Sequence, residues 1–425
     1  MLHEIAASDL EITNIVNPLR KLLRRVKVFV GEVEQIDLPN KTVVVSHGHP
    51  ADDFHSHHLE YDHLVLALGS ITNFFNLPGL SELALAMKSL PDAIRLRARI
   101  IRNLEEANSE CSHLDLQALL TFVVAGGGFA GVETVAALND FVREALPFYP
   151  ILSERMLRVM LVHPGTVILP ELGESLGRYA QQVLAQRGVE ICLNTRVTSM
   201  TENEVLLNIG PPIPCGTLIW TAGTMPNPLL SSLPCQKECG RLLVNECLQI
   251  PDWPEVWAVG DCAFVPDVSQ PGKSHPPTAQ HAIREGRVVA QNIALALSGR
   301  PPKLFSFQTI GLLASLGRRT GVARILGFNF SGFFAWWLWR TIYLSKLPGL
   351  DKKVRVAFDW TLDLLFRKDV CAVHDLPPRD GVQPHEHRRE MVLNEDQFRP
   401  TAEGEDAFSS SAGIQIAEDK WFVER

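Results

Sequence analysis

Hydrophobic and polar positions along the first part of the chain predict strands separated by turns, followed by one helix. Two Val-rich runs, VKVFVGEVEQI (26–36) and KTVVVSH (41–47), are bounded by turn residues and predict a small sheet. GHPADDFHSHHLE (48–60) is polar and predicts a hairpin loop, whereas LVLAL (64–68) is the continuous apolar run of a buried strand. Residues 91–110 place apolar side chains at helical spacing.

The middle of the chain alternates regularly between strand and helix patterns. The repeating βαβ order predicts a doubly wound α/β unit from residue 116 to 230. One more strand and a long helix, from Thr278 to about Leu297, come after it. The segments that carry this pattern are TFVVA (121–125), RVMLVHP (158–164), ESLGRYAQQVLAQRGVEICL (174–193), TLIWTAG (217–223) and EVWAVGDCA (255–263).

The C-terminal hundred residues change character twice. FNFSGFFAWWLWRTIYLSKL (328–347) is densely aromatic, and KKVRVAFDWTLDLLFRK (352–368) is amphipathic. The aromatic run is interrupted by Asn329 and Ser331 and is shorter than the roughly 20 apolar residues that a bilayer crossing needs. From Pro377 onward the chain is polar without periodicity, which predicts a disordered tail.

Length and charge narrow the class of protein. A chain of 425 residues predicts two to three domains, and 46% apolar residues are enough for sizeable cores. The net charge of −8 argues against a nucleic-acid partner, because phosphate neutralisation needs a basic face. The eight cysteines lack CxxC pairs and zinc spacing, so they are interpreted as reduced thiols.

A glycine fingerprint, GGGFAG, lies between a predicted buried strand and a predicted helix. In this context Gly126 permits the tight turn, Gly128 lets the backbone approach a pyrophosphate, and Gly131 allows close helix–strand packing. The helix N-terminus beyond it favours anions. The following strand ends in His163, where an acid would hold the adenosine ribose. The fingerprint therefore predicts a nicotinamide dinucleotide as the coenzyme, and His163 leaves both NADH and NADPH open.

Three more strand ends carry candidate binding residues: Ala67 and Gly69, Ala222 and Gly223, and Gly260 and Asp261. Open α/β sheets bind ligands at the carboxyl ends of their strands. A carboxylate there can accept hydrogen bonds from a sugar-like hydroxyl chain. Taken alone, Asp261 also fits an ordinary turn residue.

The ordered motifs LVLALGS, GGGFAGVE, TAG, VWAVGDCA and PPTAQHA resemble those of type II NADH dehydrogenases, the single-subunit NADH:quinone oxidoreductases. The resemblance runs from Leu2 to about Val370. It implies FAD between two Rossmann-like units, NADH on the second unit, and a quinone reached through the membrane. The FAD fingerprint that opens such chains is absent, and LHEIA resembles the segment that follows it. The first unit is therefore expected to be truncated at its N-terminus.

The resemblance also implies roles for individual residues. Gly260 and Asp261 would contact the FAD ribitol and phosphate, and Gln280 would lie near the isoalloxazine and the quinone. Glu133 would sit between nicotinamide and flavin, although an acid in the first turn of a helix is also favoured by the helix dipole alone. The reaction is expected to serve a respiratory chain without proton pumping, because no membrane-spanning path is apparent.

The aromatic segment is predicted to lie in the membrane surface as a peripheral anchor on the cytoplasmic side of the cell membrane. Trp336, Trp339 and Tyr343 share one helical face and would enter the acyl boundary, with flanking Arg and Lys side chains at the headgroups. The alternative is a C-terminal core or a homodimer interface. The predicted fold is thus α/β, with two Rossmann-like dinucleotide-binding domains, the first of them truncated, and a C-terminal amphipathic helical membrane anchor. The corresponding ranges are 1–115 and 231–325 for the FAD-binding domain, 116–230 for the NAD(P)H-binding domain, 326–372 for the anchor and 373–425 for the tail.

Two clusters offer competing chemistry. The histidines between residues 47 and 63 sit on a predicted hairpin without fixed ligand spacing, so no metal site is predicted. Cys235 and Cys239 would suggest a disulfide or sulfide acceptor, but a loop position favours inert thiols. Two alternatives to the quinone reductase remain open: a related FAD-dependent pyridine nucleotide reductase with a protein or disulfide acceptor, and an inactive NADH-sensing membrane protein.

Overall fold

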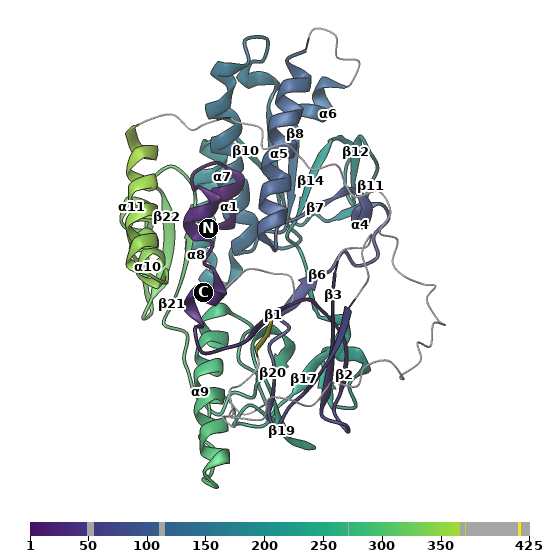
Figure 1. Ribbon diagram of the computed structural model, residues 1–425. Coiled ribbons are helices and arrows are strands. Elements are labelled where there is room, and N and C mark those ends of the chain that lie inside the picture. The colour runs from purple at the N-terminus through teal and green to yellow at the C-terminus, as the bar shows by residue number, and fades with distance from the viewer. Residues whose placement is uncertain (49–54, 110–114, 271, 366–369, 371–414, 418–425) are drawn as a thin grey trace, which may run out of the picture.

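The computed structural model describes residues 1–48, 55–109, 115–270, 272–365, 370 and 415–417. Two α/β units lie one above the other in Figure 1, and two C-terminal helices pack along one side of the upper unit. These helices are α10 (Gly332–Lys346) and α11 (Leu350–Leu365). None of the described helices combines the length and apolar content that a bilayer crossing requires.

The upper unit is built on a five-stranded parallel sheet with the strand order β10-β9-β8-β14-β7. All residues of β8 are buried, as a continuous apolar run predicts for a strand covered on both faces. Alternate residues of β8 belong to two different hydrophobic cores. Phe122 and Val124 pack with the helices, and Val123 packs with a small antiparallel sheet. The five strands are β7 (Leu85–Ala86), β8 (Thr121–Ala125), β9 (Arg158–Val162), β10 (Val189–Cys192) and β14 (Thr217–Trp220).

Helices and a second sheet cover this central sheet. Helix α5 begins with a capping box between Ser89 and Asp92, which satisfies backbone N–H groups of its first turn. The covering elements are α5 (Leu90–Ala107), α6 (Leu116–Leu120), α7 (Phe129–Ala145), α8 (Glu174–Gln186), and the antiparallel strands β11 (Val197–Met200), β12 (Glu204–Leu207) and β13 (Ile213–Pro214). Because β7 pairs with β14, residues 85–107 belong to this unit. The predicted boundary at residue 115 therefore lies too late in the chain.

The lower unit has its own core around the fully buried Trp257. Strand β5 pairs in parallel with β19, so the carboxyl ends of these two strands lie side by side. The elements of this unit are β2 (Glu32–Asp37), β3 (Thr42–His47), β4 (His55–Glu60), β5 (Leu64–Leu66), β16 (Lys237–Glu238), β17 (Arg241–Leu243), β18 (Gln249–Ile250), β19 (Trp253–Ala258), β20 (Ala263–Phe264) and α9 (Ala279–Leu297).

The chain passes between the two units at two points that lie side by side. Strand β6 (Ser70–Thr72) leaves the lower unit after Gly69, and β15 (Thr224–Pro226) returns after Gly223. The two strands pair in antiparallel register. The short helix α4 (Leu80–Leu83) follows β6 and packs against β11. The paired crossing holds the strand ends of the lower unit next to the carboxyl edge of the upper sheet.

The N-terminal residues and the C-terminal segments meet on the flank of the upper unit. Helix α1 (Leu2–Ala6) packs against α5 and α7, and α2 (Ile12–Ile15) packs against α11. An antiparallel sheet of β21 (Gly311–Ser315), β22 (Gly321–Ile325) and β23 (Phe328–Ser331) rests on α7 and supports α10. The remaining elements are α3 (Leu19–Leu22), β1 (Val28–Val30) and β24 (Gln415–Ala417), which pairs with β1.

Several predicted elements are confirmed and one is wrong. The helix predicted over residues 91–110 is α5, and the long helix from Thr278 is α9. The polar stretch predicted as a loop contains β4, whose pairing with β3 outweighs its low apolar content. The predicted disordered tail lies outside the described residues, apart from residues 415–417.

Candidate functional site

The glycine turn between β8 and α7 has the geometry that its sequence predicts. Gly126 adopts a φ of +114°, and a Cβ there would lie 2.6 Å from the Thr221 hydroxyl. A Cβ on Gly131 would lie 1.8 Å from the carbonyl oxygen of Gly126, so this contact between helix and turn requires glycine. Gly128 instead faces open space. The turn is therefore closed on the protein side and open where a pyrophosphate would approach the N-terminus of α7.

His163 occupies the end of β9, where an acid would hold a ribose. Its Nδ1 accepts a hydrogen bond from the backbone N–H of Gly127 at 3.1 Å. Burial lowers the pKa of His163, so the ring is neutral at pH 7 and can accept this bond. The ring thus completes the glycine turn and provides no carboxylate for ribose hydroxyls.

The carboxyl ends of β5 and β19 bring two predicted motifs together. The Ser70 hydroxyl donates to Oδ2 of Asp261 at 2.6 Å, and the ammonium of Lys88 lies 3.5 Å from the same oxygen. Ala67 and Gly69 precede this contact, and a Cβ on Gly69 would meet open space. Ser70, Lys88 and Asp261 therefore connect the two strand ends and gather a hydroxyl, an ammonium and a carboxylate group beside Gly69.

Gly260 is held from the opposite side by α9. Its backbone N–H donates to Oε2 of Glu285 at 2.7 Å. Burial raises the pKa of Glu285 to about 7. Gly260 has a φ of +72°, which directs the chain from β19 into the turn that carries Asp261. Glu285 therefore fixes the shape of the Gly-Asp turn.

Ala222 and Gly223 follow β14 at the crossing between the two units. A Cβ on Gly223 would lie 2.5 Å from the Phe75 ring, and its carbonyl accepts from the N–H of Asn73 at 3.0 Å. Thr221, directly before them, donates to the carbonyl of Ala125 at 2.8 Å. These residues thus secure the glycine turn and the crossing strands in one packed unit.

Glu133, in the first turns of α7, is bound by residues from distant parts of the chain. Its Oε1 accepts from the backbone N–H of Ser315 at 3.0 Å and from the Trp339 indole at 2.9 Å. Its Oε2 lies 3.5 Å from Nδ1 of His3. Burial raises the pKa of Glu133 and lowers the pKa of His3 well below its usual value. The carboxyl group therefore favours its protonated form more than an exposed glutamate does.

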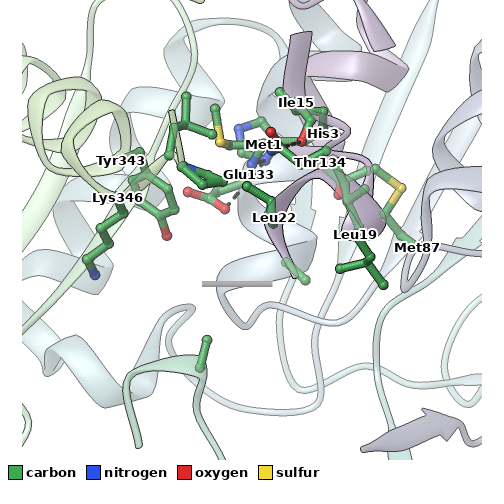
Figure 2. A pocket seen from close by; sticks show the side chains of 16 residues that line it. Met1, His3, Ile15, Leu19, Leu22, Met87, Glu133, Thr134, Tyr343 and Lys346 are labelled. Atoms are coloured by element: carbon green, nitrogen blue, oxygen red, sulfur yellow. Dashed lines mark hydrogen bonds and ion pairs between the residues drawn. The ribbon is translucent and has the colours of Figure 1, made fainter. Parts of the chain in front are cut away.

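A cavity of about 330 Å³ lies beside Glu133. Figure 2 shows His3 next to the Glu133 carboxyl group, with Tyr343 and Lys346 on one side and Met87 on the other. Nε2 of His3 is buried without a hydrogen-bond partner. The wall is mainly apolar and comes from α1, α2, α3, α7, α10 and the start of α9. Its lining also includes Leu2, Ile15, Leu19, Leu22, Ala130, Thr134, Ala279, Leu347 and Pro348.

Gln280 lies next to this cavity, one residue after Ala279 in the first turn of α9. Its amide donates to the carbonyl oxygen of Gly311 in β21 at 2.7 Å. Strand β21 also provides the Ser315 N–H that holds Glu133. The two predicted catalytic residues are thus joined through one strand that neither of them belongs to.

The structure adds four residues that the motifs do not single out. They are His3, Ser70, Lys88 and Glu285, described above with their contacts. Ser70 directly follows Gly69, and that position is a signal that the sequence offers. His3, Lys88 and Glu285 enter only through tertiary contacts, so local pattern holds no signal for them.

The predicted outward orientation of the aromatic face is wrong. Trp336 is 8% exposed and Trp339 is 1% exposed, and Tyr343 lines the cavity. Helix α10 packs on β22 and α11, and Trp339 is drawn inward by its bond to Glu133. The opposite face is exposed, with Phe333 at 60% and Trp337 at 49%.

Cys235, Cys239, His47 and His57, from the competing clusters, do not line the cavity beside Glu133. Cys235 is half-buried, with its pKa raised by burial, and Cys239 is exposed. The buried Cys262 follows Asp261, and burial raises its thiol pKa to about 11. His47 and His57 stack in β3 and β4 with their Nε2 atoms 2.7 Å apart. Across the described ranges, no three His, Cys, Asp or Glu side chains are arranged to hold a metal ion.

Comparisons with known proteins agree with this architecture. A family model described as pyridine nucleotide-disulphide oxidoreductase matches residues 2–286, and the NDH2 C-terminal domain matches residues 310–369. A probable NADH dehydrogenase of Dictyostelium discoideum is 31% identical, with 88% of this chain and 82% of that protein covered. A type II NADH:quinone oxidoreductase of Mycobacterium tuberculosis is 31% identical, with 86% and 80% covered.

A solved structure shares the fold. NDH2 from Plasmodium falciparum, in complex with NADH, has a TM-score of 0.79 at 18% identity and covers 87% of this chain and 91% of that one. Because that family model covers more than half of the chain, this fold with its paired crossing strands is that of an oxidoreductase of the pyridine nucleotide-disulphide class. Within that class, the chain belongs to the family of type II NADH dehydrogenases.

Proposed function

We propose that this protein is a FAD-dependent NADH:quinone oxidoreductase. It passes hydride equivalents from NADH to FAD and then electrons to a membrane quinone, without proton pumping. The observation that carries the proposal is the apolar cavity at Glu133, where the first turns of α7 and α9 meet α10. The names of the relatives from Dictyostelium and Mycobacterium support the same activity.

NADH would bind at the glycine turn of the upper unit. The open space at Gly128 admits a pyrophosphate, and the free N–H groups of α7 favour its charge. His163 adds no negative charge near the ribose, so NADPH remains a second coenzyme.

FAD would lie at the junction of the two units, and the residues present fit its ribityl side. Ser70, Asp261 and the open space at Gly69 provide hydrogen-bonding groups and room at the ends of β5 and β19. Lys88 offsets the Asp261 charge there. When bound, FAD would supply the two-electron carrier between coenzyme and quinone.

The quinone head group would occupy the cavity. Most of the wall there is apolar, which suits an aromatic quinone ring. His3 and Glu133 are the side chains placed to hydrogen-bond with quinone oxygens. Because burial raises the pKa of Glu133, its carboxyl group keeps a proton next to the substrate to a higher pH than an exposed glutamate does.

The outward face of the C-terminal segments would rest on the cytoplasmic side of the cell membrane. Exposed apolar side chains are concentrated on β23, α10 and α11, an unusual surface for a protein in water. They would enter the lipid boundary, from which a quinone reaches the cavity. These side chains are Phe328, Phe333, Phe334, Trp337, Leu350, Val354, Phe358 and Leu362, with Leu326 in the turn before β23.

The membrane assignment is tested by changing Phe333, Phe334 and Trp337 together to Ser. The variant should leave the membrane fraction and lose reduction of a lipophilic quinone, while reduction of ferricyanide by NADH persists. A matched control changes three exposed apolar residues of the upper unit, Phe148, Ile151 and Ile209, to Ser. Continued membrane binding of the first variant would refute the assignment. Use of this face in a homodimer would appear instead as a change in mass by light scattering.

The quinone site is tested by filling the cavity with Ala279→Phe. The expected result is a raised KM for quinone with an unchanged rate for ferricyanide. A protein that oxidises NADH with ferricyanide but never with quinones would indicate another acceptor. A folded, FAD-supplemented protein that binds NADH without oxidising it would indicate a sensing role.

A further inference from the structure

A short basic segment follows the second N-terminal helix. Residues 19–27, called the basic segment here, contain five cationic side chains: Arg20, Lys21, Arg24, Arg25 and Lys27. No acidic residue occurs from 12 to 31. All five side chains are exposed, although the whole protein carries a net charge of −8. The positive charge is therefore local and opposes the overall charge.

The basic segment adjoins the C-terminal helices. The Lys21 ammonium lies 3.7 Å from Asp351 at the start of α11, and Nη1 of Arg20 donates to the Val28 carbonyl at 3.1 Å. The Lys352 ammonium also bonds the carbonyl oxygen of Thr13. These contacts fix the segment beside Leu350 and Val354, which are 77% and 60% exposed.

The same segment forms part of the cavity wall. Leu19 and Leu22 line the cavity together with Tyr343 and Pro348. Leu22 is also 44% exposed, so the cavity reaches solvent beside the basic side chains. Arg24 and Arg25 make no ion pair with any residue the structure describes, which leaves their charge available.

We propose that the basic segment is a binding site for anionic phospholipid headgroups. The proposal rests on the membrane association proposed above and adds the class of lipid and the orientation. Apolar insertion alone is nonspecific, whereas juxtamembrane Lys and Arg side chains are attracted to the surface potential of anionic lipids. Headgroups bound at the basic segment would orient the protein so that the part of the cavity wall formed by Leu22 faces the lipid, which contains the quinone.

The test is co-sedimentation of the full-length protein with two kinds of vesicle, one of phosphatidylcholine only and one also containing phosphatidylglycerol. The protein should prefer the anionic vesicles, and raised salt should remove the preference. Arg24→Glu with Arg25→Glu should weaken binding to anionic vesicles by about tenfold or more, since each basic residue near the surface contributes about fivefold. The same variant should keep its binding to phosphatidylcholine and its ferricyanide activity.

A control with the same charge change, Arg155→Glu with Arg300→Glu, alters two exposed residues elsewhere and should keep the preference. Equal binding of the wild-type protein to both vesicles would overturn the headgroup site and leave membrane association standing. The headgroup site would also be overturned if the control lost the preference for anionic vesicles as fully as the Arg24 and Arg25 variant does. Absence of binding to either vesicle would refute the membrane association itself and the headgroup site with it.

Discussion

The Trp339 indole donates a hydrogen bond to Glu133 across 206 residues of sequence, at 2.9 Å. Glu133 belongs to the helix that follows the glycine turn, and Trp339 belongs to the helix with an exposed apolar face. One hydrogen bond therefore joins α7, the helix proposed to meet the coenzyme, to the segment proposed to meet the membrane. It also explains why the most buried aromatic residue of α10 points away from solvent.

Replacing Trp339 with Phe keeps the apolar packing and removes the donor to Glu133. The Ser315 N–H remains, so the protein should fold, with a loss of about 1–3 kcal/mol for a buried acceptor deprived of one partner. Quinone reduction should fall more than ferricyanide reduction. Urea unfolding and the two activities measure these effects. Trp337→Phe, at an exposed position on the same helix, should change neither.

Gly128→Glu should abolish NADH binding, because the side chain fills the open space at the turn and adds a repelling charge. Gly128→Ala tests the same space with a neutral methyl group, and its backbone φ of −79° suits alanine. It should weaken NADH binding without unfolding the protein. Fluorescence titration with NADH measures the affinity of both variants. An unchanged affinity in the Gly128→Glu variant would show that this turn does not bind the coenzyme.

Asp261→Ala should lower the flavin content of the protein purified with added FAD. The substitution removes the acceptor that Ser70 and Lys88 share, and it removes a predicted partner of the ribityl hydroxyls. The flavin-to-protein absorbance ratio measures the effect. Asp252→Ala, in the exposed turn between β18 and β19, is the control. Full flavin content in both variants would make Asp261 a turn residue only.

His163→Asp should increase the preference for NADH over NADPH by about tenfold, the scale of one charged hydrogen bond. A carboxylate at the end of β9 can accept from ribose hydroxyls and repels a 2′-phosphate. His163→Asn keeps an acceptor for Gly127 without the charge and should leave the preference unchanged. The ratio of kcat/KM for the two coenzymes measures this, and an equal ratio in all three proteins contradicts it.

Stability should fall as the pH rises from about 4.5 to 7 through the titration of Glu285. Its pKa is raised from 4.5 to about 7 by burial, so in this range the unfolded chain releases a proton that the folded protein keeps. Two and a half pKa units correspond to about 3 kcal/mol. Glu285→Gln retains an acceptor for Gly260 and should flatten this part of the profile. Urea unfolding of both proteins at pH 5 and pH 8 measures the difference, and parallel profiles would contradict it.

Local sequence was sufficient for the elements that carry the nucleotide-binding motif. Apolar strands, a glycine turn and amphipathic helices each follow from residues close together in the chain, and α5, β8 and α9 lie where those patterns predict. Strand β4 could not be predicted in this way, because its histidines are polar and it becomes a strand only by pairing with β3. The unit boundary was missed for a similar reason, since β7 is two residues long and belongs to the upper sheet only through β14.

The sequence by itself determined the strand–turn–helix around Gly126 and Gly128 and the presence of an apolar aromatic helix, since spacing and residue type decide these locally. Tertiary structure alone decided which face of that helix is outward. Helical spacing places Trp336, Trp339 and Tyr343 together, but Trp337 and Phe333 are equally apolar, so hydrophobicity cannot choose between the two faces. The inward face packs on β22 and places the Trp339 indole against the buried carboxyl group of Glu133. Its desolvation requires hydrogen-bond donors, and the Trp339 indole is one of those that the folded chain brings within reach.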